Sequence, residues 1–132
     1  YSGDMFPERY KNGAFIAFHG STNRSPYPQA GYLVGFIPFE EGLPSGDLEI
    51  FADGFAQVEV IKEMKDAKYR PMGLAEGPDG SIYISDSKKG KIWRVAFTAD
   101  KSSFTDENLK VMELRKNLPH IKTPIEFQDI VK

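Results

Sequence analysis

The sequence contains no cysteine, so disulfide bonds, thiolate metal sites and cysteine nucleophiles are all excluded. It also has no apolar run approaching the roughly 20 residues that a membrane-spanning helix needs. Basic residues are not in excess, since 17 Lys and Arg stand against 19 Asp and Glu, giving a net charge of -2 at pH 7. This balance argues against nucleic-acid binding, which favours a basic stripe. The 132 residues, 40% of them hydrophobic, suffice for one globular domain with a core.

Histidine is scarce too, because only His19 and His120 are present. Neither has clustered carboxylates nearby in the sequence, so the pattern indicates no self-contained metal site.

The clearest structural signal lies in residues 70–95. Short apolar runs are separated there by turn residues, and Asp79-Gly80 is flanked by apolar residues on both sides. Such a dipeptide is the strongest short-range hairpin signal, because Gly accepts the positive φ of a tight turn. The pattern predicts a three-stranded antiparallel meander, with strands at 72–76, 81–86 and 91–97.

Earlier apolar runs of strand length alternate with Gly-, Asn-, Asp- and Pro-rich turns, which is typical of an all-β meander. They predict strands at 13–19, 32–39 and 47–53. Residues 1–12 are polar and turn-rich and are interpreted as a surface loop, and residues 56–69 as a long connection that is either short helix or strand. Thr105 is a candidate N-cap for a helix through about residue 116, and prolines 119 and 124 predict an extended or irregular end.

The two meanders repeat each other. Residues 13–19 align with 80–86 at an offset of 67 positions, and residues 31–36 align with 90–95 at an offset of 59. The difference is an insertion of 8 residues between His19 and Gly31. Repeated antiparallel meanders predict the four-stranded blades of a β-propeller. We therefore expect about two blades in residues 1–97, the first lacking its innermost strand, followed by an extension over residues 98–132.

In a four-stranded blade, the loop after the second strand and the loop entering the first lie on the same face. The repeat therefore predicts that several polar residues gather around one mouth, while the turn at Pro78-Asp79-Gly80 lies on the opposite face. The residues expected at this mouth are His19, Asn23, Arg24, Lys68, Arg70 and Asp86.

Two segments carry a resemblance to a known family: His-Gly-Ser-Thr-Asn-Arg at 19–24, and Arg-Pro-Met-Gly-Leu-Ala at 70–75 with the meander after it. They resemble the closing part of the propeller in the PQQ-dependent glucose/sorbosone dehydrogenase family. This resemblance implies a six-bladed propeller, pyrroloquinoline quinone (PQQ) as cofactor, possibly calcium with ligands not identifiable here, and a periplasmic or extracellular location. It also implies that the chain is a fragment of a longer polypeptide.

PQQ carries three carboxylates, so its site needs fixed cations, and Arg70 is the best candidate because guanidinium binds carboxylate bidentately. The resemblance adds His19, Asn23 and Arg24 as cofactor contacts and leaves the catalytic base in an earlier blade, outside this chain. On the residues alone, His19 is equally a loop-bonding histidine, Arg24 a loop-shaping arginine and Asn23 a turn residue. Asp86 is expected to cap its loop.

We therefore expect the parent protein to be a quinoprotein dehydrogenase that oxidises a sugar-like alcohol or aldehyde by hydride transfer to PQQ. This segment would form part of the cofactor-binding face and be inactive alone. Its expected partners are the small-molecule substrate, the remainder of the propeller or another chain along the open edges, and a cytochrome electron acceptor. The alternatives are a non-enzymatic propeller used as a binding or scaffold module, in which the insertion is a recognition loop, and a lactonase-like propeller.

Overall fold

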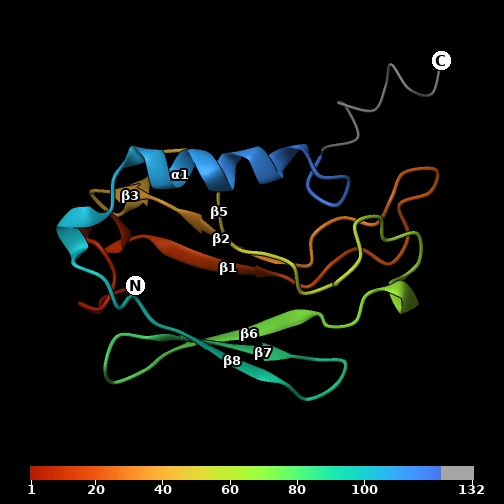
Figure 1. The fold of residues 1–132 in the computed structure, drawn as a ribbon, viewed down its shortest axis with the longest axis horizontal. Helices are drawn as coiled ribbons and strands as arrows, with labels where there is room; N and C mark the ends of the chain where they lie inside the picture. Colours follow the sequence, from red (N-terminus) through yellow and green to blue (C-terminus); the bar gives the residue numbers. More distant parts are fainter. Residues whose placement is uncertain (123–132) are drawn as a thin grey trace.

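The computed structural model describes residues 1–122, and within them the chain is mostly β, with three small antiparallel sheets and one helical segment near the C-terminal end. Figure 1 shows the first sheet and helix α1 on one side and the second three-stranded sheet on the other. No helix in the described part is long and apolar enough to cross a membrane.

The first sheet has the strand order β1-β2-β5, with β1 at Ala14–Phe18, β2 at Leu33–Ile37 and β5 at Glu49–Ala52. All neighbours are antiparallel, and the register shifts at a bulge in the β2–β5 pairing. A two-stranded ribbon, β3 (Phe39–Glu40) with β4 (Leu43–Pro44), lies in the connection from β2 to β5. The strand predictions for this half are confirmed, with tighter bounds than the apolar runs suggested.

The second three-stranded sheet has the order β6-β7-β8, formed by Pro71–Glu76, Ile82–Asp86 and Ile92–Val95. It is antiparallel throughout, as the Asp-Gly signal predicted. Gly80, at the tip of the β6–β7 turn, has a φ of +81° and accepts a hydrogen bond on its carbonyl from the Tyr1 hydroxyl, 2.6 Å away. The long connection before this sheet contains a single 3-10 turn, η2 (Met64–Asp66).

The two sheets correspond strand for strand where the repeat predicted, since β1 matches β7 and β2 matches β8. They differ in the third strand: β5 pairs with β2 after the shared pair, whereas β6 pairs with β7 before it. Each sheet therefore has three strands. The expected four-stranded blades are not seen in residues 1–122, because each sheet lacks the strand that the other has.

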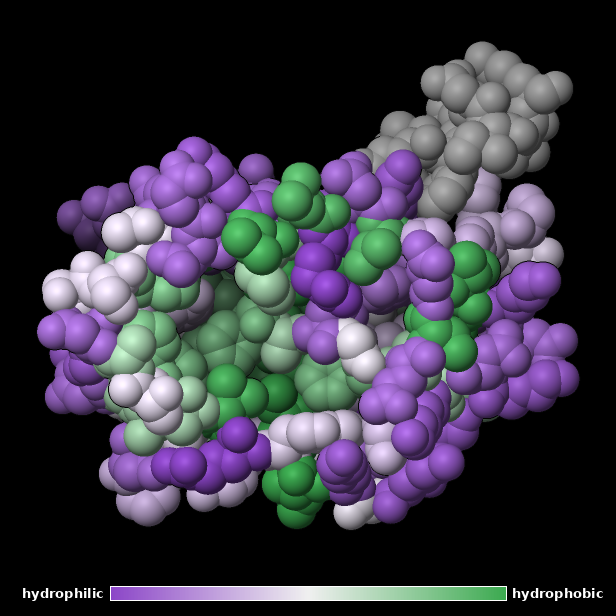
Figure 2. All heavy atoms as spheres, viewed as in Figure 1, coloured by the Kyte–Doolittle hydropathy of each residue, from purple (hydrophilic) through white to green (hydrophobic). Residues whose placement is uncertain are grey.

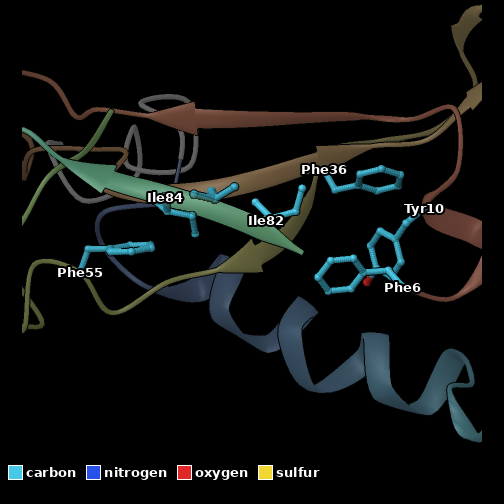
Figure 3. Packing of buried hydrophobic residues seen from close by; sticks show 7 residues of the cluster. Phe6, Tyr10, Phe36, Phe55, Ile82 and Ile84 are labelled. Carbon is cyan, nitrogen blue, oxygen red and sulfur yellow. The ribbon is translucent and has the colours of Figure 1, made fainter. Parts of the chain in front are cut away.

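The main core lies between the two sheets and contains buried residues from both, together with residues from the N-terminal segment (Figure 3). Its buried members are Phe6, Tyr10, Val34, Phe36, Phe55, Ile82 and Ile84. Phe6 and Tyr10 are 4% and 7% exposed, so the prediction that residues 1–12 form a surface loop is wrong. A short 3-10 helix, η1 (Glu8–Tyr10), directs the Tyr10 ring against Phe36, with centroids 4.8 Å apart. The turn-forming residues there mask the contribution of the apolar ones.

The C-terminal extension enters a 3-10 turn, η3 (Lys101–Ser103), and then helix α1 (Asp106–Glu113), which continues as η4 (Leu114–Asn117). Thr105 caps α1 through a capping box with Asn108, so the predicted N-cap is confirmed. Helix α1 packs against β5 and thereby covers the first sheet on the side away from the second.

Candidate functional site

The ends of β1 and β7 meet at one end of the molecule, and the side chains that follow these strands contact each other. His19 comes directly after β1, and Ser87 directly after β7. A hydrogen bond of 2.6 Å joins His19 Nε2 to the Ser87 hydroxyl. The repeat thus brings together two residues that lie 68 positions apart in the sequence.

Arg70 lies directly beneath this pair and is 7% exposed. Its Nε donates to the His19 carbonyl at 3.1 Å, and a terminal nitrogen donates to the Gly20 carbonyl at 2.9 Å. The guanidinium also lies over the Tyr32 ring, 5.4 Å from its centroid. Arg70 therefore fastens the loop after β1 to the entrance of β6, and it places a permanent positive charge below His19.

Gly20 permits this close packing. Its φ is +104°, and a Cβ at this position would lie 2.4 Å from the Tyr32 ring. A side chain here would therefore strain the backbone and push the ring away from Arg70.

Asp86 organises the turn that carries Ser87. Its carboxylate accepts hydrogen bonds from the backbone N–H groups of Arg70 at 2.6 Å and Lys89 at 2.5 Å. Burial raises the pKa of Asp86, but these backbone donors outweigh it and the net pKa lies below the usual value. Asp86 thus caps its loop, as expected, and holds the entrance of β6 against the end of β7.

His19 is only partly enclosed, and its pKa is lowered from the usual 6.5. Burial is the main cause and the charge of Arg70 the second, while the Asp86 carboxylate opposes both. The imidazole is therefore neutral at pH 7 and has one donor and one acceptor nitrogen. Which of them faces Ser87 depends on the tautomer.

A pocket of about 240 Å³ opens next to the His19–Ser87 pair. Its lining consists of Met64, Lys65, Arg70, Ser87 and Lys88. Three of these five residues are cations and none is a carboxylate, so the pocket favours an anionic group. Lys88 is held in place because its Nζ donates to the backbone carbonyls of Lys65, at 2.9 Å, and Ala67.

Asn23 and Arg24, the other two predicted cofactor contacts, do not join this pocket. Arg24 donates to the Pro28 carbonyl at 3.0 Å and to the Lys122 carbonyl at 2.5 Å. Asn23 lines a separate groove of about 350 Å³ formed by the inserted loop and residues 60 and 62. Lys68, also expected at the mouth, donates to Gln57 instead. The structure thus brings His19 and Arg70 together and places Asn23 and Arg24 elsewhere.

A buried ionic cluster attaches the C-terminal extension, and the sequence reasoning did not find it. The Asp53 side chain, 2% exposed, accepts hydrogen bonds from Arg115 Nε at 2.8 Å and His120 Nε2 at 2.9 Å. The His120 carbonyl in turn accepts from the Gly31 N–H at 2.8 Å. His120 lies between Leu118-Pro119 and the last described turn, where no periodic pattern indicates burial. The charged ends of otherwise ordinary residues gave no signal.

Burial raises the pKa of Asp53, but the hydrogen bonds from His120, the Gly54 N–H and Arg115 together outweigh it, so the net pKa is lowered. The Asp53 carboxylate is therefore ionised at neutral pH and paired with Arg115. Within residues 1–122, no group of three or more His, Asp or Glu side chains is arranged to hold a metal ion.

An apolar hollow lies on another side of the molecule, between the end of β5 and β8. It measures about 210 Å³, and Phe55, Tyr69, Ile84, Trp93 and Val95 form its apolar lining. In Figure 2 apolar residues gather in a depression between the α1 side and the β8 side of the surface. Trp93 packs edge-on against Phe55 and Tyr69, at 4.9 and 5.2 Å between centroids.

Comparison with known families places this arrangement. The TrAA12-like family model matches residues 4–98, which include both three-stranded sheets. The chain belongs to the TrAA12-like family. The assignment to the PQQ-dependent glucose/sorbosone dehydrogenase family, predicted from the segments at 19–24 and 70–75, is therefore wrong. The same finding overturns the description of the chain as a quinoprotein dehydrogenase fragment on the strength of that resemblance.

This TrAA12-like chain is also similar to an uncharacterized protein of Borreliella burgdorferi, with 34% identity over 98 residues. The match covers 74% of this chain but only 24% of the relative, so the chain spans about a quarter of the relative's length. No solved structure matches it.

Proposed function

We propose that this chain supplies part of the cofactor-binding face of a larger β-propeller dehydrogenase that oxidises a sugar-like alcohol or aldehyde by hydride transfer to PQQ. In this proposal, the first sheet is the second to fourth strands of one blade and the second sheet is the first to third strands of another. The remaining strands belong to the rest of the propeller, which lies along the open edges. The expected location is the periplasm or the cell exterior, and the expected electron acceptor is a cytochrome.

One observation carries the cofactor part of this proposal, namely the pocket beside His19 with three cations and no carboxylate in its lining. PQQ has three carboxylates, and Lys65, Arg70 and Lys88 match them in number and sign. Charge-assisted hydrogen bonds to carboxylates are about twice as strong as neutral ones. Arg70 and Lys88 are already fixed by backbone carbonyls, so little side-chain entropy is lost when an anion binds.

The chain's own residues have distinct roles in this arrangement. Arg70 holds a fixed positive charge, and Lys65 and Lys88 neutralise carboxylates at the rim. The Ser87 hydroxyl and the neutral His19 imidazole provide hydrogen bonds that orient the bound group. The quinone supplies the hydride-accepting chemistry when bound, and this segment contributes no base. Calcium remains part of the proposal for the whole protein.

Quenching of the fluorescence of Trp93, the single tryptophan, by added PQQ at low salt tests this. We expect saturable binding that weakens about 3- to 10-fold in a Lys65→Met variant, because one charge-assisted contact is worth about 1 kcal/mol or slightly more. Lys62→Met, which removes a lysine outside this pocket, is the matched control. Unchanged affinity in Lys65→Met contradicts the proposed site.

Citrate, a tricarboxylate without a quinone, serves as competitor. If citrate displaces PQQ at equal concentration, the pocket recognises anions in general and the PQQ assignment fails. Activity is measured on the full-length parent with PQQ, calcium, a panel of aldoses and an artificial electron acceptor. Absence of quinone reduction across the panel argues against a dehydrogenase.

A second candidate function is a binding module for a protein or glycan. The groove of about 350 Å³ over the inserted loop favours it. This loop is fixed, because the Gln29 N–H donates to the Ile61 carbonyl at 2.7 Å and its side-chain amide to the Lys62 carbonyl at 3.3 Å. A loop held in one shape recognises a partner at lower entropic cost. Glycan-array binding that Asn23→Ala weakens and Lys65→Met does not would favour this function.

A further inference from the structure

The outer edges of the two larger sheets are treated differently by the fold. Strands β1 and β6 lie next to each other, and β5 packs against helix α1. Within residues 1–122, no strand pairs with the outer side of β8. An open strand edge presents unpaired N–H and C=O groups to any extended chain that reaches it.

The pairing pattern shows which backbone groups of β8 face outward. The Asp86 N–H donates to the Lys91 carbonyl at 2.8 Å, so residues 86 and 91 form a hydrogen-bonded pair. Hydrogen-bonded and non-hydrogen-bonded pairs alternate in an antiparallel ladder. Trp93 therefore bonds to β7, while the N–H and C=O groups of Ile92 and Arg94 point to the open side. The Ile92 residue is 66% exposed, in agreement with an uncovered edge.

The internal repeat indicates what fits this edge. Strand β2 of the first sheet corresponds to β8, and β5 pairs antiparallel with β2 on the side that is open in β8. By this correspondence, the residues opposite Val34 and Phe36 in the first sheet predict residues opposite Trp93 and Val95 in the second. The open edge of β8 is thus equivalent to a position that already holds a strand elsewhere in the same molecule.

The apolar hollow gives a second, independent observation. In the first sheet β5 inserts Phe51 into the core, where its ring lies 4.6 Å from that of Phe15. Beside β8 no such side chain is present among the described residues, and a hollow of about 210 Å³ opens instead, next to Trp93 and Val95. A large apolar side chain from a paired strand would fill it.

The charges near this edge add a preference. Lys88, Lys89 and Lys91 lie at the end where β8 begins, and β5 is followed by Asp53 at the corresponding end. An acidic residue at the C-terminal end of the incoming strand would face these lysines.

We propose that the β8 edge is a docking site for an antiparallel strand from outside this chain. The strand has a large apolar side chain that enters the hollow beside Trp93 and an acidic residue at its C-terminal end. This inference rests on the strand correspondence used in the proposed function and is independent of the anion pocket at His19. Loss of PQQ binding and loss of strand binding are therefore separate outcomes.

The test uses the 132-residue chain and a synthetic peptide with the sequence of residues 47–53, which contains β5 and its flanking aspartates. Amide hydrogen exchange is followed by NMR with and without peptide. We expect exchange to slow by at least about tenfold at the outward-facing amides of Ile92 and Arg94. The amide of Trp93, already bonded to β7, should change little.

An Ile92→Pro variant removes an outward-facing N–H without breaking the β7 pairing, and should abolish the effect. Ile92→Ala keeps the N–H and is the matched control, with thermal unfolding as the check that both variants fold. Protection at β1 or β6, or none at Ile92 and Arg94, overturns the proposal. Sedimentation measures whether the chain dimerises alone; a dimer lost in Ile92→Pro would assign the edge to a second copy and also overturn it.

Discussion

The two three-stranded sheets share two matching strands, but their central strands are buried differently. In β2 every residue from Leu33 to Phe36 is buried, because Val34 and Phe36 face the core and the other side of the sheet is covered as well. In β7 buried and half-buried residues alternate from Ile82 to Asp86. The first sheet is thus enclosed on two sides and the second on one.

The difference teaches how the same pattern acquires different roles. The N-terminal segment and helix α1 supply the additional cover of the first sheet, and neither belongs to the repeat. The second sheet has no such cover and leaves an open edge and a hollow. Substitutions at matching positions should therefore have unequal effects, and those effects test the comparison.

The largest effect is expected in the covered sheet. Phe36→Ala should lower the free energy of unfolding by about 3–5 kcal/mol, because a buried ring in contact with Tyr10 and Phe15 is lost. Ile84→Ala should cost about 2–3 kcal/mol, since the neighbouring hollow allows the site to relax. Urea unfolding measures both. Equal losses would remove the distinction between the two sheets.

The next effect concerns the link between the sheets. Arg70→Met should lower the free energy of unfolding by about 2–4 kcal/mol, because the carbonyls of His19 and Gly20 lose their donor. Arg24→Met, at a more exposed loop, should cost less. The comparison is made by urea unfolding at pH 7. A greater loss in Arg24→Met would contradict the role of Arg70 as the fastening between the sheets.

A smaller effect is expected at the attachment of the C-terminal extension, where pH is the variable. The pKa of Asp53 is lowered on folding, so its contribution to stability is present above its unfolded pKa of about 3.8 and is lost as pH falls through the folded value. Asp53→Asn should cost about 1–3 kcal/mol at pH 6. The difference from the unaltered chain should shrink by pH 3 in thermal unfolding. A constant difference would show that this carboxylate does not carry the pH dependence.

The smallest effect is expected at the exposed pair on the second sheet. Ser87→Ala should change the free energy of unfolding by no more than about 0.5 kcal/mol, because its hydrogen bond to His19 is solvent-accessible. Ser81→Ala, at a fully buried position of the same sheet, should cost about 1 kcal/mol. Urea unfolding resolves the two. A large loss in Ser87→Ala would make the pair structural and weaken its assignment to ligand binding.

Most of the strands were predictable from the sequence, because Asp79-Gly80 and the apolar runs are local signals. The contact of His19 with the second sheet followed from the repeat, which converts sequence spacing into position in space. Phe6 and Tyr10 were missed since their neighbours form turns, and burial there depends on the distant Phe36. His120 was missed for the same reason, because its partner Asp53 lies 67 positions away.

The position of Arg24 shows another limit. Its spacing from His19 predicted a shared pocket, but an inserted loop is free to turn away, and the carbonyls of Pro28 and Lys122 determine its direction. Local sequence does not contain the carbonyl of Lys122. The family assignment failed differently, since short segments at 19–24 and 70–75 resemble one family while residues 4–98 match another.

The buried Asp53 has a practical consequence for where this domain is cut. The family match ends at residue 98, but Arg115 and His120 lie beyond it and hold a carboxylate that is 2% exposed. A truncation at residue 98 would leave that charge buried without its cationic partners and would uncover β5. The folding unit, defined by its interactions, therefore extends at least to His120, about 20 residues past the boundary that sequence similarity draws.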